Sequence, residues 1–417
     1  MTEMRRDADL DRLVAQLNLD KRNAAAPDAD AQADEGTGPT PLTPLTPLAS
    51  LEQLDVSPDE PLDALLAELV RRRASDLLLL SGLPPTLRID GRLVQLERAP
   101  LGRDEVGGIL ANHLSSRVRQ QIAERGSADF SLRRPSGDES RSLRLRVNIH
   151  RQRGDLAAAI RALPTEAPSF ASLGLPPSLG ELAKVTRGLV LITGPTGSGK
   201  TSTLAAIVAE INRTRACHVV TIEDPVEIEH RHGRSAVEHV EVGRDTPSFA
   251  DGLRAALRQD PDVILVGEMR DLETVSTALT AAETGHLILS SLHTNDAAQS
   301  VHRIVDVFPA SQQEQIRQQL ALSVHAIASQ HLLPRADGRG RVPAVELLLA
   351  TPAVRHHIRS GQLQKLYTEI TLGKRIGMIG LEESLAALVR EGLVSRDEAE
   401  ARSGRPEELR SLLAGVA

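Results

Sequence analysis

The pattern of apolar and polar positions predicts an extended N-terminal segment followed by two folded regions. Residues 1–20 are charged with apolar residues at helical spacing, which predicts either a short docking helix or a transient one. Further along, Thr40–Leu48 repeats a Pro-Leu-Thr unit, and proline at every third position excludes a packed helix or sheet. We therefore expect residues 1–59 to form a disordered extension.

Residues 60–163 read as a small α+β domain, because short apolar runs alternate with turn signals and interrupting helical segments. Helical spacing covers 62–73, 103–113 and 114–124. The predicted strands are Asp76–Leu80, Thr86–Ile89, Leu93–Leu96, Ala128–Leu132, Leu143–Ile149 and Ala157–Arg161. Residues 164–186 are predicted to form an interdomain linker, in which 164–177 is a loop-like hinge.

From residue 187 to residue 400 the pattern changes to buried strands alternating with helices, which is typical of a parallel α/β sheet. The predicted strands are Leu189–Ile192, His218–Ile222, Val263–Val266 and Leu287–Leu292. After Ser311 the pattern predicts mostly helix, with a hairpin near Pro334–Glu346, and residues 401–417 are expected to be a flexible tail.

Composition narrows the functional class. The apolar fraction of 41% and the charged fraction of 25% are typical of a soluble globular protein. A net charge of −7 and an aromatic content of 1% argue against a nucleic-acid partner. Cys217 is the only cysteine, which fits a reducing cytoplasm, and neither a signal peptide nor a run of membrane-spanning length is evident.

A glycine-rich stretch between a predicted strand and a predicted helix has the sequence of a P-loop. Such a loop wraps its backbone N–H groups around a polyphosphate, which predicts ATP as the ligand. Lys200 is expected to reach the β and γ phosphates, and Thr201 to hold Mg²⁺. The predicted nucleotide-binding residues here are Gly194, Pro195, Thr196, Gly197, Ser198, Gly199, Lys200, Thr201 and Ser202.

Acidic residues and histidines follow the other predicted strands. Glu223 and Asp224 end one strand, where a carboxylate can ligate Mg²⁺ or orient water. Glu268 follows the strand 263–266, and we expect it to contribute to the metal site and to polarise the attacking water. His286 and His293 bracket a further strand. Since a straight strand cannot bring both to one phosphate, one is expected to sense the γ-phosphate and the other to couple to a neighbouring subunit.

These motifs together resemble those of the secretion ATPases. The P-loop, Ile222–Glu227, Asp262–Asp271 and Thr280–His286 look like the Walker A, Asp box, Walker B and His box of that superfamily. Within it the chain resembles the type IV pilus retraction (twitching-motility, PilT-type) ATPases over residues 62–395. The segment Thr351–Arg359 is similar to the retraction motif of that family.

The resemblance implies a PAS-like N-terminal domain, a RecA-like ATPase domain and a homohexameric ring that drives pilus retraction. It also implies an inner-membrane platform protein as partner and a cytoplasmic location at the inner face of that membrane. Arginines of the N-terminal domain reach the phosphates in the family, and Arg144, Arg146 and Arg161 are the candidates by position. The chain departs from the sequence pattern of this family at Leu78, Glu238-His239, His356-His357 and Ser360. These departures bear on the retraction role and do not affect the P-loop or Glu268.

Other functions remain open at this point. The chain could be an accessory retraction paralogue, or an assembly or type II secretion ATPase, although one cysteine cannot build the four-cysteine zinc module of the latter. A RecA-type nucleic-acid motor and a switch that binds ATP with little turnover are the alternatives from other classes.

Overall fold

The computed structural model describes residues 60–89, 91–136, 138–164, 166–338 and 340–415. The predicted N-terminal extension, residues 1–59, and its possible docking helix lie outside the described residues.

The first folded region is a six-stranded antiparallel sheet with the strand order β3-β2-β1-β6-β5-β4. Its strands are β1 (Asp76–Leu79), β2 (Thr86–Ile89), β3 (Arg92–Gln95), β4 (Ser127–Ser136), β5 (Asp138–Gln152) and β6 (Asp155–Leu163). The accompanying helices are α3 (Glu60–Arg71), α4 (Glu105–Leu110), the 3₁₀ turn η1 (Ala111–His113) and α5 (Ser116–Arg125). This matches the predicted α+β arrangement element by element.

One face of this sheet packs against its helices. Leu145, Val147 and Ile149 of β5 are fully buried with α3, α4 and α5 in one apolar cluster. Because side chains alternate along a strand, Arg144 and Arg146 project from the opposite face. The fold of this region therefore presents two candidate arginines on the face that its own helices leave uncovered.

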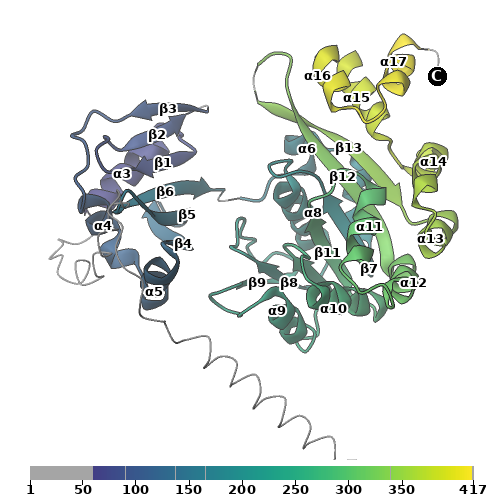
Figure 1. Ribbon diagram of the computed structural model, residues 1–417, viewed down its shortest axis with the longest axis horizontal. Helices are drawn as coiled ribbons and strands as arrows, with labels where there is room; N and C mark the ends of the chain where they lie inside the picture. Colours follow the sequence, from purple (N-terminus) through teal and green to yellow (C-terminus); the bar gives the residue numbers. More distant parts are fainter. Residues whose placement is uncertain (1–59, 90, 137, 165, 339, 416–417) are drawn as a thin grey trace, which may run out of the picture. The chain divides into compact units, whose positions relative to one another are not determined.

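The second folded region is a seven-stranded sheet with the order β13-β12-β7-β11-β10-β8-β9 (Figure 1). Its strands are β7 (Gly188–Thr193), β8 (His218–Glu223), β9 (Ala236–Glu241), β10 (Val263–Val266), β11 (Leu287–Leu292), β12 (Val324–Pro334) and β13 (Arg341–Leu349). All neighbours are parallel except β12 and β13, which form an antiparallel hairpin. The predicted parallel α/β organisation is confirmed.

Helices cover both faces of this sheet, which explains why its central strands are continuous apolar runs. The covering helices are α8 (Lys200–Thr214), α9 (Phe249–Ala256), α10 (Leu272–Glu283), α11 (Ala297–Asp306) and α12 (Gln313–Ser323). Leu189 and Leu191 of β7 pack with α9 to α12, whereas Val190 and Ile192 pack with α8. Every residue of β7 is buried, so the strand that leads into the P-loop is fixed from both sides.

Two strands differ from the sequence prediction. Strand β9 was not expected, because Ala236–Glu241 is an edge strand in which three of six residues are polar and only Val237 is deeply buried. Strand β12 begins at Val324, in a region predicted to be helical before the hairpin. An apolar run buried on both faces cannot be distinguished from a buried helix by its periodicity alone.

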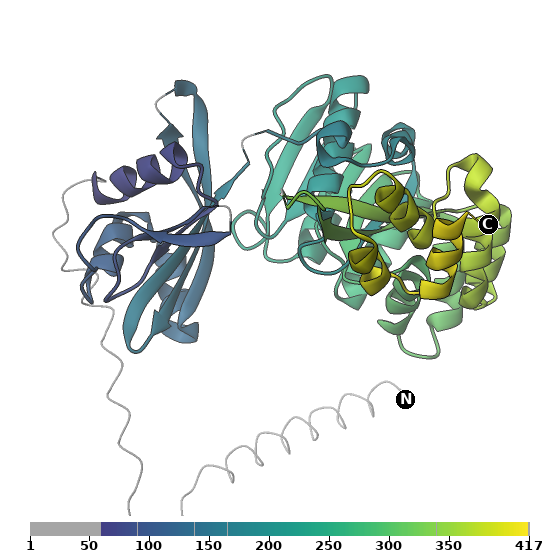
Figure 2. The same cartoon turned by 90° about the horizontal axis from the view of Figure 1, so that it is seen from above.

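The C-terminal part is a group of helices packed against the hairpin and the neighbouring helices of the sheet. They are α13 (Pro352–Arg359), η3 (Leu363–Lys365), α14 (Leu366–Leu372), η4 (Gly373–Ile376), α15 (Leu381–Arg390), α16 (Arg396–Arg402) and α17 (Pro406–Ala414). Figure 2 shows the helices at the C-terminal end of the chain, in yellow, lying beside one another. The expected flexible tail of 401–417 is therefore wrong for α17, whose Leu409 is fully buried in a cluster with Leu333 of β12 and Leu385 of α15.

The predicted linker at 164–186 also has more structure than a loop. It contains α6 (Phe170–Leu173), α7 (Pro177–Gly180) and η2 (Glu181–Lys184), and Ser169 and Ser172 form a capping box at α6. Leu175 and Leu179 are buried in the cluster that includes α8, so this segment belongs to the packing of the second sheet. No helix in the described part of the chain is long and apolar enough to cross a membrane.

Glu346 of β13 is a buried carboxyl whose ionisation costs stability. Its side chain is 6% exposed, and its Oε1 accepts a hydrogen bond of 2.9 Å from the backbone N–H of Ala297 at the start of α11. Burial raises the pKa of Glu346 to about 7 despite that bond. Between the unfolded value of 4.5 and about 7 the folded state binds more protons than the unfolded state, so stability falls as pH rises through that window.

We predict that Glu346→Gln keeps the hydrogen bond to Ala297 and removes the cost of ionising a buried carboxyl. The free energy of unfolding of the variant should exceed that of the wild type by up to about 3 kcal/mol at pH 8 and differ little at pH 4.5. Urea unfolding of the wild type and the variant across this pH range measures the difference. Glu398→Gln, at an exposed position of α16, is the matched control and should leave the pH dependence unchanged. Equal pH slopes for wild type and Glu346→Gln would contradict this assignment.

Candidate nucleotide-binding site

The P-loop joins the end of β7 to the start of α8. Gly194, Gly197 and Gly199 have φ angles of 142°, 78° and 90°, which residues that carry a Cβ rarely adopt. A Cβ on Gly194 would also overlap the carbonyl oxygen of Gln330. The backbone conformation therefore requires all three glycines, and the packing of the loop is a second reason for glycine at Gly194.

Lys200 is the first residue of α8 and its side chain is folded back into the loop. The ammonium donates to the carbonyl oxygens of Gly194 (2.9 Å) and Pro195 (3.1 Å), and the residue is 8% exposed. Burial lowers the pKa of Lys200, and the negative charge of Glu268 opposes that shift. Thr201 and Ser202 follow in the first helical turn and are half-buried.

Glu268 and His293 lie beside the loop because β10 and β11 end at the same edge of the sheet as β7. The Nε2 of His293 is 3.8 Å from Oε2 of Glu268, and its Nδ1 is 3.4 Å from Oγ1 of Thr196. Arg270 pairs with the other oxygen of Glu268 at 2.7 Å. The structure thus brings together Lys200, Glu268, His293 and Thr196.

The surroundings of His293 favour the neutral form of its imidazole. Partial burial lowers its pKa, and the nearby positive charge of Lys200 adds to that effect, while Glu268 opposes it. A neutral imidazole can donate or accept one hydrogen bond without adding charge to the site.

His286 lies at the other end of β11 and is not part of this group. Its Nδ1 is 3.1 Å from the carbonyl oxygen of Ala281 in α10, and its own carbonyl accepts from the N–H of Gly188. Among the described residues, no contact joins His286 to the P-loop, Glu268 or His293.

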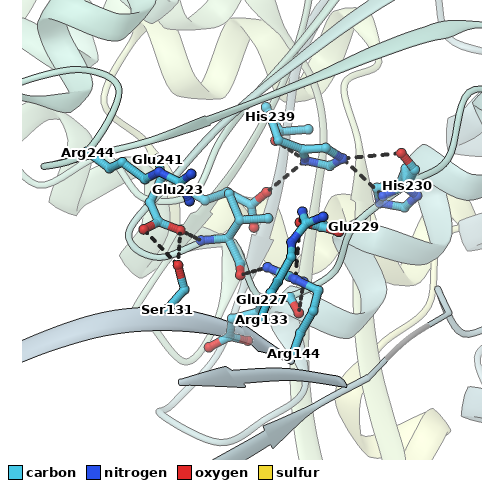
Figure 3. Close-up of polar contacts among 12 residues, drawn as sticks. Ser131, Arg133, Arg144, Glu223, Glu227, Glu229, His230, His239, Glu241 and Arg244 are labelled. Atoms are coloured by element: carbon cyan, nitrogen blue, oxygen red, sulfur yellow. Dashed lines mark hydrogen bonds and ion pairs between the residues drawn. The ribbon is translucent and has the colours of Figure 1, made fainter. Parts of the chain in front are cut away.

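Glu223 ends β8, the strand beyond β10, and its side chain faces a different set of partners (Figure 3). It is 9% exposed and lies 3.9 Å from Nδ1 of His239, which also contacts Oγ1 of Thr221 at 2.8 Å. The ring of His230 stacks on that of His239 with centroids 5.8 Å apart, and burial lowers the pKa of His230 to about 4.

The predicted metal residues are not assembled as a cluster. The described residues contain no group of three or more His, Cys, Asp or Glu placed to hold a metal ion. Asp224 is exposed, and none of the described contacts joins Glu223 to Glu268 or Lys200.

The three candidate arginines make hydrogen bonds and ion pairs with residues outside the P-loop. Arg144 is 5% exposed and donates to the carbonyl oxygens of Val226 (2.6 Å) and Glu227 (3.0 Å), and its Nε pairs with Glu229 at 3.1 Å (Figure 3). Burial lowers its pKa, and the charge of Glu229 opposes the shift. The described contacts of Arg144 therefore do not include the P-loop.

Arg146 and Arg161 are also paired away from the loop. Arg146 lies 3.4 Å from Glu227 and 3.9 Å from Asp129, and Arg161 bonds Asp76 at 2.8 Å. Arg161 has the most exposed side chain of the three, at 64%. In the described part of a single chain, none of the three arginines meets Lys200 or Glu268.

Sequence reasoning missed Gln330 of β12, which is buried against the P-loop. Its side chain contacts Ser198 and Thr203, both at 2.7 Å. Gln330 belongs to no motif and follows the loop by more than a hundred residues, so only the pairing of β12 with β7 could have revealed it.

Comparison with known proteins defines the class of this nucleotide site. Residues 59–379 match the family model described as type II/IV secretion system protein. The chain is 42% identical over 343 residues to the type IV pilus retraction ATPase PilT of Pseudomonas aeruginosa, covering 82% of this chain and 98% of that protein. It is 41% identical over 325 residues to the twitching motility protein of Neisseria gonorrhoeae, covering 78% and 86%.

A solved structure agrees with these relatives. The crystal structure of the pilus retraction motor PilT with bound ADP matches with a TM-score of 0.75 and 46% identity, over 83% of this chain and 97% of that one. The chain belongs to the type II/IV secretion system protein family and is an ATP-hydrolysing, nucleotide-binding enzyme. The resemblance to PilT-type ATPases noted in the sequence is confirmed.

We predict that Lys200→Ala lowers the affinity for ADP by about 10- to 100-fold, because a charged hydrogen-bond donor to the phosphates is lost. Titration with a fluorescent ADP analogue measures this. Lys184→Ala is the matched control, since Lys184 is 73% exposed and pairs only with Glu181 among the described residues. Wild-type affinity in Lys200→Ala would remove the loop from the binding site.

Proposed function

We propose that the chain is an ATPase motor that powers the retraction of type IV pili and thereby twitching motility. The observation that carries this proposal is the grouping of Lys200, Glu268 and His293 at the ends of three neighbouring strands. The relatives named as retraction ATPase and twitching motility protein, which the chain covers almost end to end, supply the biological role.

The chemistry follows from the residues of this group. Lys200 exchanges its carbonyl partners for the β and γ phosphates, and the loop N–H groups bind the remaining phosphate oxygens. Thr201 would hold Mg²⁺ together with those phosphates, where the ion would offset the phosphate charge, and Glu223 and Asp224 are further candidate ligands. Glu268 orients and deprotonates the attacking water, and His293 donates a hydrogen bond near the γ-phosphate.

A ring of six copies would add positive charge to that which Lys200, Arg270 and, at 3.5 Å from the Gly197 carbonyl oxygen, Arg341 bring to this site. Lys200 and Arg270 are the cations next to Glu268 in the described residues, whereas a triphosphate bears up to four negative charges. We therefore propose that arginines of the N-terminal region act across a subunit boundary, and Arg161 has the most exposed side chain of the three candidates, although it bonds the buried Asp76. A location at the cytoplasmic face of the inner membrane, against a platform protein, is part of the same proposal.

We predict that Glu268→Gln binds ATP normally but hydrolyses it at least about 100-fold more slowly, because the amide cannot accept the proton of the water. Phosphate release and nucleotide binding are measured on the same preparation. Glu398→Gln, at an exposed position of α16 outside every motif, is the control and should match the wild type. Loss of ATP binding in Glu268→Gln would mean that Glu268 is structural rather than catalytic.

The direction of the motor is tested in cells. We predict that a strain lacking this chain keeps or gains surface pili and loses twitching, because assembled pili are no longer withdrawn. Electron microscopy of the cell surface and colony spreading measure the two effects. Cells without pili would instead assign the chain to pilus assembly.

A further inference from the structure

Gln330 occupies the position on β12 that lies directly beside the first residue of the P-loop. Strands β12 and β7 run parallel, and Ser329 opposite Thr193 is the last pair in their register. Gln330 and Gly194 are therefore the residues that follow this last pair in β12 and after β7. The Gln330 side chain is 4% exposed, so its amide is confined to the interior between β12 and the loop.

The Gln330 amide makes two hydrogen bonds whose chemistry fixes its orientation. A carbonyl oxygen can only accept, so the Nε2 must donate to the Ser198 carbonyl oxygen, at 2.7 Å. The Oε1 then accepts from the hydroxyl of Thr203 in α8, also at 2.7 Å. One side chain thus joins the loop to the helix that follows it.

The loop wraps around this residue closely. A Cβ on Gly194 would overlap the Gln330 carbonyl oxygen, and a Cβ on Gly199 would lie 2.8 Å from its Nε2. Two glycines of the motif are thus needed to accommodate Gln330 as well as for their backbone angles.

The bond to Ser198 also determines where a phosphate-binding N–H points. In a planar trans peptide the C=O and the following N–H point in opposite directions. Because Gln330 draws the Ser198 carbonyl toward β12, the N–H of Gly199 is turned away from β12. In a P-loop this N–H is among the groups that face the phosphates.

We propose that Gln330 is a positioning residue that holds the Ser198–Gly199 peptide in its phosphate-binding orientation. The proposal rests on the proposed function in requiring that a nucleotide binds at this loop. Gln330 itself does not touch the nucleotide; it acts through the Ser198 carbonyl and through Thr203.

The test compares Gln330→Met with Ser329→Ala. Methionine keeps the length of the side chain and removes both hydrogen bonds, so we expect the affinity for ADP to fall by about tenfold. Ser329→Ala removes a buried hydrogen bond of the neighbouring β12 residue, at 2.8 Å to Thr193, and should leave the affinity for ADP near the wild-type value. Thermal unfolding of both variants shows whether each is folded to a similar extent.

A second variant distinguishes positioning from packing and serves if Gln330→Met fails to fold. In Gln330→Glu an ionised carboxylate can accept from Thr203 but repels the Ser198 carbonyl, whereas the protonated acid can donate to it. ADP affinity should therefore be weak at pH 8 and recover as pH falls toward 5, relative to the wild type measured at each pH.

Two results would overturn the positioning role. One is wild-type ADP affinity in Gln330→Met, and the other is an affinity in Gln330→Glu that follows the wild type at every pH. A wild-type chain that binds no ADP would refute the proposed function itself, which separates the two failures.

Discussion

The parallel alignment of β12, β7 and β11 is the constraint on which the rest of the site depends. Thr193, the last residue of β7, is in register with Ser329 of β12 and with Leu292 of β11. The three strands therefore reach the same edge of the sheet, and the residues at or just after that edge include Gln330, the P-loop and His293. Strand β10 adds Glu268 at the same edge, because β10 pairs in parallel with β11. Since both faces of the sheet are covered by helices, these groups stand on a rigid support.

The charged side chains near this edge of the sheet fall into two networks with different partners. The charge of Glu268 opposes the lowering of the Lys200 pKa, both residues affect the pKa of His293, and the three side chains lie together beside the loop. Glu223 and Arg144 belong to a second network, with His239, Val226, Glu227 and Glu229 as their partners.

The sequence was sufficient wherever function depends on local pattern. The P-loop, Glu268 after an apolar strand and the four central strands were all predicted, since each combines a short motif with a buried run. Gln330 could not be predicted, because its role arises from strand pairing between distant segments. The same holds for α17, which is ordered by contacts of Leu409 with the hairpin and α15, and for Arg144, whose partners come from the segment after β8. His286 and His293 looked equivalent in sequence, and only the direction of β11 separates them.

Phosphate release from ATP by the purified chain, measured beside Lys200→Ala under the same conditions, tests the central claim most directly. The account predicts steady Mg²⁺-dependent turnover by the wild type and a rate at the blank level for the variant, because the P-loop, Lys200 and Glu268 form one hydrolytic site. Equal rates for the two proteins would contradict the account, since hydrolysis would then not take place at this loop.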